Sequence, residues 1–122
     1  MDNRDIAAEF LRMCARGEVR DAYARFVSDD FVHHNAWFAG DRESLLLAME
    51  QSAAAEPNKS FEVRQVIDGG DRVAVLSHLK RASMDVEYAV VHIARIEGGR
   101  IVELWDVGQE IPTDSPNANG MF

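Results

Sequence analysis

The sequence contains little cysteine and little proline, with one Cys and three Pro among 122 residues. The single thiol, Cys14, cannot form an internal disulfide, so nothing in the chain requires an oxidising compartment. The first residues also lack the basic and then apolar pattern of a secretory signal peptide. These absences lead us to expect a cytoplasmic protein.

Basic residues are also scarce, since 13 lysines and arginines stand against 21 acidic residues, which gives a net charge of -8. Such a charge repels phosphate backbones, and the basic residues are scattered rather than clustered, so we expect no nucleic-acid partner. No apolar run approaches the roughly 20 residues of a membrane span, and we expect no membrane partner. The remaining composition, 47% hydrophobic and 28% charged, is typical of one globular domain over residues 1–122.

The chain lacks the spaced motifs that hold metals or nucleotides. It has no HExxH pattern, no cysteine pair and no calcium-loop order of carboxylates. Its two glycine pairs, Gly69-Gly70 and Gly98-Gly99, fall between predicted strands rather than before helices, so they do not predict a phosphate-binding loop. We therefore expect neither a metal nor a cofactor.

Apolar residues recur at helical spacing in the first half of the sequence. Within residues 2–16, four of them share one helix stripe at i, i+4, i+7 and i+8, namely Ile6, Phe10, Met13 and Cys14. Similar patterns predict helices over residues 18–26 and 42–55. Residues 28–30 should break the second helix, and residues 31–35 are predicted to form a short strand.

The second half changes to period-two or continuous apolar patterns, which predict strands over residues 61–67, 72–81, 86–96 and 100–109. Their connectors are short enough for an antiparallel meander. The strand over 72–81 is largely apolar on both faces, so its second face should line a cavity or pack on another chain. Residues 111–122 are interpreted as an irregular tail.

Helices followed by such a sheet indicate an α+β fold suited to holding a pocket. Several stretches resemble the SnoaL-like branch of the NTF2-like superfamily: His34-Asn35, residues 75–78, VVHIARIEGGRIVELWDVGQ over 90–109, and residues 119–122. The most specific element is the final strand, GRIVELWDV. The resemblance implies a cone in which three N-terminal helices pack on a curved antiparallel sheet that encloses a pocket, and it implies a homodimer.

The same resemblance implies chemistry without a metal or cofactor. Polyketide cyclases of this branch close rings by intramolecular aldol condensation, while other members of the superfamily isomerise, open epoxides, dehydrate or only bind ligands. The fold alone therefore does not determine the function.

Asp106 is the leading candidate for a catalytic residue. It follows Trp105 in a strand that also contains Ile101, Val102, Leu104 and Val107, and desolvation by such apolar neighbours should raise its pKa toward the range of a general acid or base. The resemblance assigns the acid/base role to this aspartate. The alternative is a structural carboxylate paired with an arginine or a neighbouring turn.

His92 is a second catalytic candidate, and its relation to Asp106 depends on the hairpin at Gly98-Gly99. A two-residue loop would place His92 opposite Trp105 and separate it from Asp106, whereas a three-residue loop would place both on one face. We favour the three-residue loop, because it opposes His92 to Leu104, where relatives commonly carry an aspartate and a histidine. These two departures from the family pattern leave open whether His92 transfers protons or fills space.

The resemblance also selects His34 as a catalytic candidate and Asn35 as a substrate-binding one. His33 and His34 are adjacent, so on a strand only one of them can face a pocket. Asn35 could orient a carbonyl group or cap a turn. His78 is expected to line the pocket, although a lone strand histidine is also compatible with a hydrogen-bonded core position.

Three large aromatic residues complete the predicted substrate-binding set. Trp37 and Phe38 precede the third helix and could form a pocket wall or plug the open end of the cone. Trp105 adjoins Asp106 in the final strand.

Together these residues predict an enzyme that acts on a small, largely apolar carbonyl compound. Asp106 would remove a proton α to the carbonyl, and His34, Asn35 or His92 would donate hydrogen bonds to the enolate oxygen. The alternative prediction is a non-catalytic ligand-binding or dimerisation module of the same fold.

Overall fold

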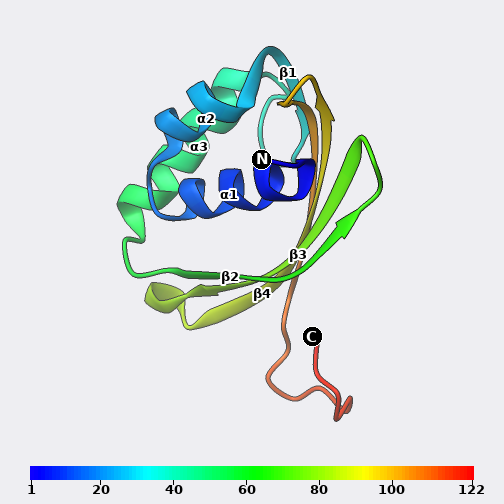
Figure 1. The fold of residues 1–122 in the computed structure, drawn as a ribbon. Coiled ribbons are helices and arrows are strands. Elements are labelled where there is room, and N and C mark those ends of the chain that lie inside the picture. Colours follow the sequence, from blue (N-terminus) through cyan, green and yellow to red (C-terminus); the bar gives the residue numbers. More distant parts are fainter.

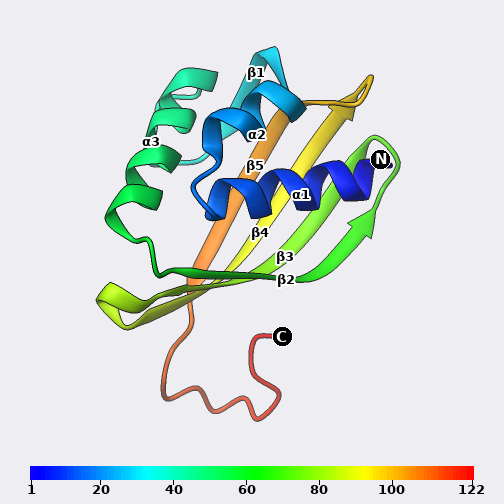
Figure 2. The same ribbon diagram turned by 60° about the vertical axis from the view of Figure 1, so that its left-hand side comes forward.

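Three helices cover the concave face of a curved five-stranded sheet in the computed structural model, which describes all of residues 1–122 (Figures 1 and 2). The helices and strands are α1 (Asn3–Ala15), α2 (Val19–Phe26), β1 (Val27–His34), α3 (Arg42–Ala55), β2 (Ser60–Asp68), β3 (Arg72–Arg81), β4 (Val86–Glu97) and β5 (Arg100–Glu110), with a 3-10 turn at Ala82–Met84. The α+β architecture is confirmed, and the predicted helices and the four later strands agree with these bounds to within one or two residues.

Local sequence explains the helix starts. Asp2 caps α1 by accepting a hydrogen bond from the Asp5 N–H, and the Asp5 side chain accepts one from the Asp2 N–H in return. Asp41 caps α3 through the Ser44 N–H. No helix in the chain combines the length and the apolar character needed to cross a bilayer.

The strand order is β1-β5-β4-β3-β2. Strands β2 to β5 form the predicted antiparallel meander, but β1 pairs with β5 in parallel, so the whole sheet is mixed. Strand β1 also begins at Val27, four residues earlier than predicted, because the chain passes directly from α2 into extended backbone. The segment 28–30 therefore ends the helix, as predicted, but belongs to the strand.

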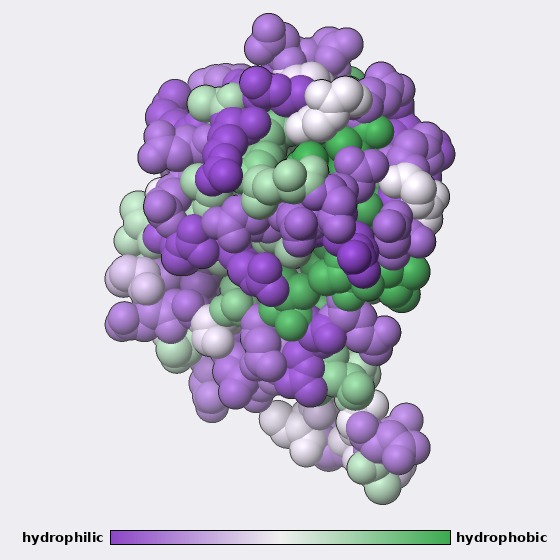
Figure 3. Space-filling view, in the orientation of Figure 1, coloured by the Kyte–Doolittle hydropathy of each residue, from purple (hydrophilic) through white to green (hydrophobic).

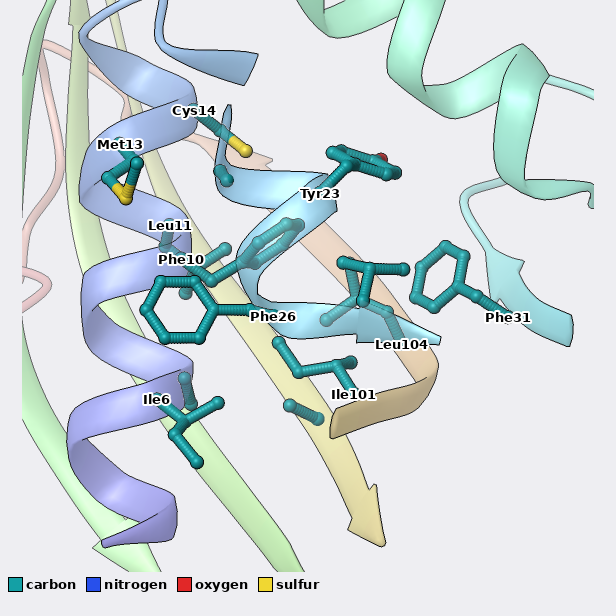
Figure 4. Packing of buried hydrophobic residues seen from close by; sticks show 14 of the residues in the cluster. Ile6, Phe10, Leu11, Met13, Cys14, Tyr23, Phe26, Phe31, Ile101 and Leu104 are labelled. Atoms are coloured by element: carbon teal, nitrogen blue, oxygen red, sulfur yellow. The ribbon is translucent and has the colours of Figure 1, made fainter. Parts of the chain in front are cut away.

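The core lies between the helices and the sheet. Phe10 of α1, Tyr23 of α2 and Phe31 of β1 meet edge to face, with ring centroids 5.4 and 6.1 Å apart. Leu104 and Ile101 of β5 belong to the same cluster, and both are fully buried (Figure 4). This packing sets the distance between the helical layer and β5.

The opposite, convex face of the sheet is not covered by any element of the chain. Hydrophilic side chains dominate the surface seen in Figure 3. Val91 and Val107 are cross-strand partners on the convex face, and Val107 is 68% exposed. Residues 111–122 contain no helix or strand, and their last residue, Phe122, stacks on His78 of this face at 4.7 Å.

Candidate functional site

A cavity of about 280 Å³ lies between the helices and the concave face of the sheet. Helices α1 and α3 form one wall, the strands form the other, and the segment after β1 closes one side. Ten of its 15 lining residues are hydrophobic. The lining consists of Leu11, Cys14, Ala15, Asn35, Phe38, Leu45, Ala48, Met49, Ser52, Lys59, Phe61, Leu79, Val90, His92 and Asp106.

A polar cluster of Asp106, His92 and Asn35 occupies the sheet side of this cavity. The Asn35 side-chain amide donates to Asp106 Oδ2 at 2.8 Å, and His92 Nε2 lies 3.5 Å from Asp106 Oδ1. The Asp106 side chain is 18% exposed and that of His92 is 8% exposed. A carboxylate that is neither solvent-exposed nor bound to a guanidinium thus faces a mostly apolar space.

The pKa of Asp106 is lower than the usual value for an aspartate. Burial is the largest influence and raises this pKa, but the hydrogen bonds from His92 and Asn35 and the electrostatic influence of the His92 and His33 imidazoles together outweigh it. The prediction of a raised pKa is therefore wrong, because the sequence showed the apolar neighbours of Asp106 and not its donors. Near neutral pH the group is an ionised base, not a proton donor.

The hairpin between β4 and β5 explains why His92 meets Asp106. Gly98 and Gly99 both have positive φ, at 58° and 78°, and form a two-residue loop that pairs Glu97 with Arg100. The prediction of a three-residue loop is therefore wrong.

Beyond that loop, the register shifts between Arg95 and Ile96, where Val102 of β5 has no partner. This bulge places His92 directly opposite Asp106 instead of Trp105. His92 and Asp106 share a face of the sheet, as expected, but they do so because of the bulge and not because of a three-residue loop. The cross-strand pair of an acid and an imidazole that relatives carry at positions 92 and 104 is formed here between His92 and Asp106.

The ring of His92 has one atom without a partner. Its Nδ1 is buried and makes no hydrogen bond. In the neutral ring, the geometry favours a hydrogen on Nε2, which can donate to Asp106, and leaves a lone pair on Nδ1. Phe61 lies beside the ring, with centroids 6.4 Å apart.

Asn35 is held in a defined orientation. Its side-chain oxygen accepts from the Trp37 N–H at 3.0 Å, so its amino group must point toward Asp106. Its own backbone N–H donates to His33 Nδ1 at 3.1 Å, and His33 Nε2 then donates to the Ala39 carbonyl at 2.7 Å. His33, which the resemblance did not select, is therefore the inward-facing histidine and supports the site from behind.

His34 and Trp105 lie on the convex face, outside the cavity. The parallel register pairs His34 with Trp105, and their rings stack at 5.1 Å. His34 Nε2 also lies 2.6 Å from Glu103 Oε2. The expectations that His34 is catalytic and that Trp105 binds substrate are both corrected, because strand alternation directs His33 inward and His34 outward.

His78 and Trp37 also lie outside the cavity. His78 projects from the convex face of β3, where its Nε2 lies 2.6 Å from Glu87 Oε1. Trp37 is 86% exposed and does not line the cavity, whereas Phe38 does. The expectation that His78 and Trp37 line the pocket is therefore corrected. His78 occupies a strand position that faces the convex side of the sheet, and the loop after β1 directs Trp37 into solvent.

Two polar lining residues were not predicted. Ser52 lies seven residues after Leu45 and three after Met49, so helical spacing alone could have placed it on the cavity face of α3. Lys59 belongs to the turn between α3 and β2, and no periodic signal indicates where a turn side chain points. Cys14 lines the cavity, but burial raises the pKa of its thiol to about 12, which leaves no nucleophilic thiolate.

Solved structures share this architecture at low sequence identity. IdmH from Streptomyces antibioticus, described as a candidate polyketide cyclase, is 19% identical with a TM-score of 0.69, over 88% of this chain and 93% of that one. AclR from Streptomyces galilaeus, a candidate hydroxylase, is 23% identical with a TM-score of 0.71, over 85% and 86%. An NTF2-like protein of unknown function from Cytophaga hutchinsonii is 16% identical with a TM-score of 0.72, over 89% and 91%. These similarities show the NTF2-like fold.

No curated protein matches the sequence. The profile of the SnoaL-like domain, by contrast, matches residues 7–104, which is most of the chain and runs from within α1 to the first half of β5. The chain therefore belongs to the SnoaL-like domain family.

Proposed function

We propose that this protein is a cofactor-independent enzyme that removes a proton α to the carbonyl of a small, largely apolar compound. The observation that carries the proposal is the ionised Asp106 carboxylate, held by Asn35 and His92 at the wall of an apolar cavity. A base oriented in this way suits proton abstraction from carbon.

The first step breaks a C–H bond next to the carbonyl. Asp106 takes the proton, and the electron pair moves to the carbonyl oxygen as an enolate. The second amide hydrogen of Asn35 is the donor available to that oxygen, because the N–H of the neutral His92 ring is directed at Asp106 and His34 lies on the opposite face of the sheet. A ligand that displaces water from the cavity also removes solvation from the carboxylate, which raises its basicity.

The second step uses the enolate carbon as the nucleophile. Attack on a second carbonyl of the same molecule forms a C–C bond and closes a ring, and protonated Asp106 returns its proton to the new alkoxide. An aldol-type cyclisation of this kind conserves all atoms of the substrate and needs no oxidant. The cavity contributes by holding a flexible substrate in a folded conformation.

The experiment that tests the base is hydrogen–deuterium exchange at the α carbon of 2-tetralone, followed by NMR in D₂O. We expect exchange above the buffer rate with the wild-type protein and a loss of roughly 10²–10⁴-fold of that enhancement in Asp106→Asn. Glu103→Gln is the matched control, since it removes a carboxylate from the convex face. Equal exchange by wild type and Asp106→Asn would exclude the proposed base.

A non-catalytic binding module is the second candidate. One observation favours it: both carboxylate oxygens of Asp106 already face protein groups, as they would in a purely structural role. The module predicts that 2-tetralone binds in the cavity without any increase in exchange, so the same experiment separates the two candidates.

We also propose that the convex face pairs with a second copy of the chain. Exposed apolar side chains, among them Val32, Ile67, Val91 and Val107, lie on this face, where a solvent-facing antiparallel sheet would normally be polar. Sedimentation at micromolar concentration should give a dimer, and Val107→Asp should convert it to a monomer. A monomeric wild-type protein would contradict this proposal.

A further inference from the structure

Lys59 is the only cationic residue that lines the cavity. It extends from the turn between α3 and β2, whereas Asp106 lies on β5, so the two charges come from different walls. Its side chain is half-buried. Lys59 also borders two neighbouring hollows outside the cavity, which places it at the edge of the cavity, where we locate the mouth.

The positive charge of Lys59 has no carboxylate partner. Its single side-chain hydrogen bond goes to Ser52 Oγ, at 3.1 Å. The neighbouring carboxylate, Glu56, is buried and engaged by two guanidinium nitrogens of Arg81 and by the Ser83 hydroxyl. Glu56 therefore fixes the turn to the end of β3 and leaves the ammonium group free.

The cost of burying the Lys59 ammonium group is not fully offset by its neighbours. Burial lowers the pKa of Lys59, and the nearby charge of Glu56 opposes this only in part. An anionic oxygen placed next to Lys59 and the Ser52 hydroxyl would form a charge-assisted hydrogen bond and offset the cost of burial.

The surroundings of the mouth are also suited to an anion. The hollow outside Lys59 is bordered by Arg12 and Arg16 and has a single acidic member, Glu62. Arg16 is bound to Glu9 and Glu18, which leaves Arg12 and Lys59 as the cations without an ion-pair partner in this area of a chain whose net charge is -8. Such an area raises the local concentration of anionic ligands that the rest of the surface repels.

We propose that Lys59 and Ser52 form a subsite for an anionic oxygen group, and that the substrate is an amphipathic keto acid. Its carbonyl would lie at Asp106, its apolar body along Phe61, Leu79 and Met49, and its carboxylate at Lys59. The keto-acid assignment rests on the proposed function, whereas the anion subsite stands on the contacts of Lys59 alone.

The subsite is tested with two probes of equal size, 2-naphthoate and its neutral analogue 2-naphthamide, by isothermal titration calorimetry. Wild type should bind the naphthoate more tightly than the amide. Lys59→Met should weaken naphthoate binding roughly tenfold and change amide binding less than about twofold, because only the anion gains a charged hydrogen bond. Lys59→Arg should restore most of the preference.

The chain supplies a matched control, since its only other lysine is the exposed Lys80 on β3. Lys80→Met makes the same change in charge and should leave both affinities unchanged. In the wild-type protein, 2-naphthoate should also protect Lys59 from reductive methylation while Lys80 reacts as before, and this measurement requires no variant.

Equal affinity of wild type for the two probes, or equal losses in Lys59→Met and Lys80→Met, would overturn the subsite. Its failure is distinct from failure of the proposed enzyme. Asp106→Asn should lose exchange on 2-tetralone and keep the preference for naphthoate. A lost preference in Lys59→Met and a lost exchange in Asp106→Asn therefore report on different claims.

Discussion

The two faces of the sheet carry the same kind of residue pair in different surroundings. On the convex face, His34 with Glu103 and His78 with Glu87 approach to 2.6 Å. On the concave face, His92 and Asp106 are 3.5 Å apart, yet both are largely buried and border a cavity. A short distance between an imidazole and a carboxylate therefore does not identify a functional site. Burial of the pair beside a cavity is the better indicator, because charges interact more strongly where water is excluded.

The largest expected effect is on catalysis at the concave face. Asp106→Asn should reduce the exchange enhancement by roughly 10²–10⁴-fold, while Glu103→Gln should leave it within about twofold. NMR of the α-deuterated ketone measures both. A comparable loss of exchange in Glu103→Gln would contradict the conclusion that only the concave face is catalytic.

Stability should show a contrast of several kcal/mol. Leu104 is fully buried on the concave side of β5, and Leu104→Ala should reduce the free energy of unfolding by about 2–5 kcal/mol. Val107 lies three residues later and is 68% exposed, so Val107→Ala should reduce the free energy of unfolding by no more than about 0.5 kcal/mol. Urea unfolding measures both, at a protein concentration low enough to keep the chain monomeric.

Asn35→Ala should have an intermediate effect. It removes the amide that holds Asp106 Oδ2, so the pKa of Asp106 should rise and the exchange rate should fall by roughly tenfold. The pH profile of exchange separates this effect from a loss of folding, because its acidic limb should move to higher pH. An unmoved limb with a lower rate would show that Asn35 acts on the substrate instead.

The pH dependence of stability follows from the direction of the Asp106 shift. The folded pKa is below the unfolded value of about 3.9, so Asp106 contributes stability that is complete above about pH 4. This contribution is lost as the pH falls from 3.9 through the folded pKa. The difference in unfolding free energy between wild type and Asp106→Asn should therefore shrink on acidification over that range, and an unchanging difference would contradict the lowered pKa.

The smallest effect is expected at His34. Its partner Glu103 also binds Arg95, and the His34 side chain is half exposed, so His34→Ala should cost about 0–1 kcal/mol of stability. Exchange should stay within twofold of wild type. A large loss of activity would return His34 to the catalytic set.

Much of the fold could be predicted because its signals are local. The stripe of Ile6, Phe10 and Cys14, and the acidic caps before α1 and α3, depend only on residues within a few turns. The glycine pairs Gly69-Gly70 and Gly98-Gly99 marked the turns between strands and so indicated where those strands end. The parallel pairing of β1 could not be predicted, since it joins residues about 70 positions apart.

The candidate site was predicted in part. Asp106, His92, Asn35 and Phe38 line the cavity, but the resemblance could not show that His33, not His34, turns inward. That choice depends on how β1 aligns with β5, and one residue of register exchanges the two faces. Lys59 could not be predicted at all, because a turn residue is aimed by the packing of the elements on either side of it.

The sequence by itself determined the helices, the meander and the presence of a carboxylate among apolar neighbours, because periodicity and turn chemistry act over a few residues. The tertiary structure decided which imidazole meets that carboxylate, through an unpaired Val102 in one strand. It also decided the direction of the Asp106 pKa shift, since hydrogen-bond donors from another strand and from the segment after β1 outweigh burial only when the folded chain brings them together.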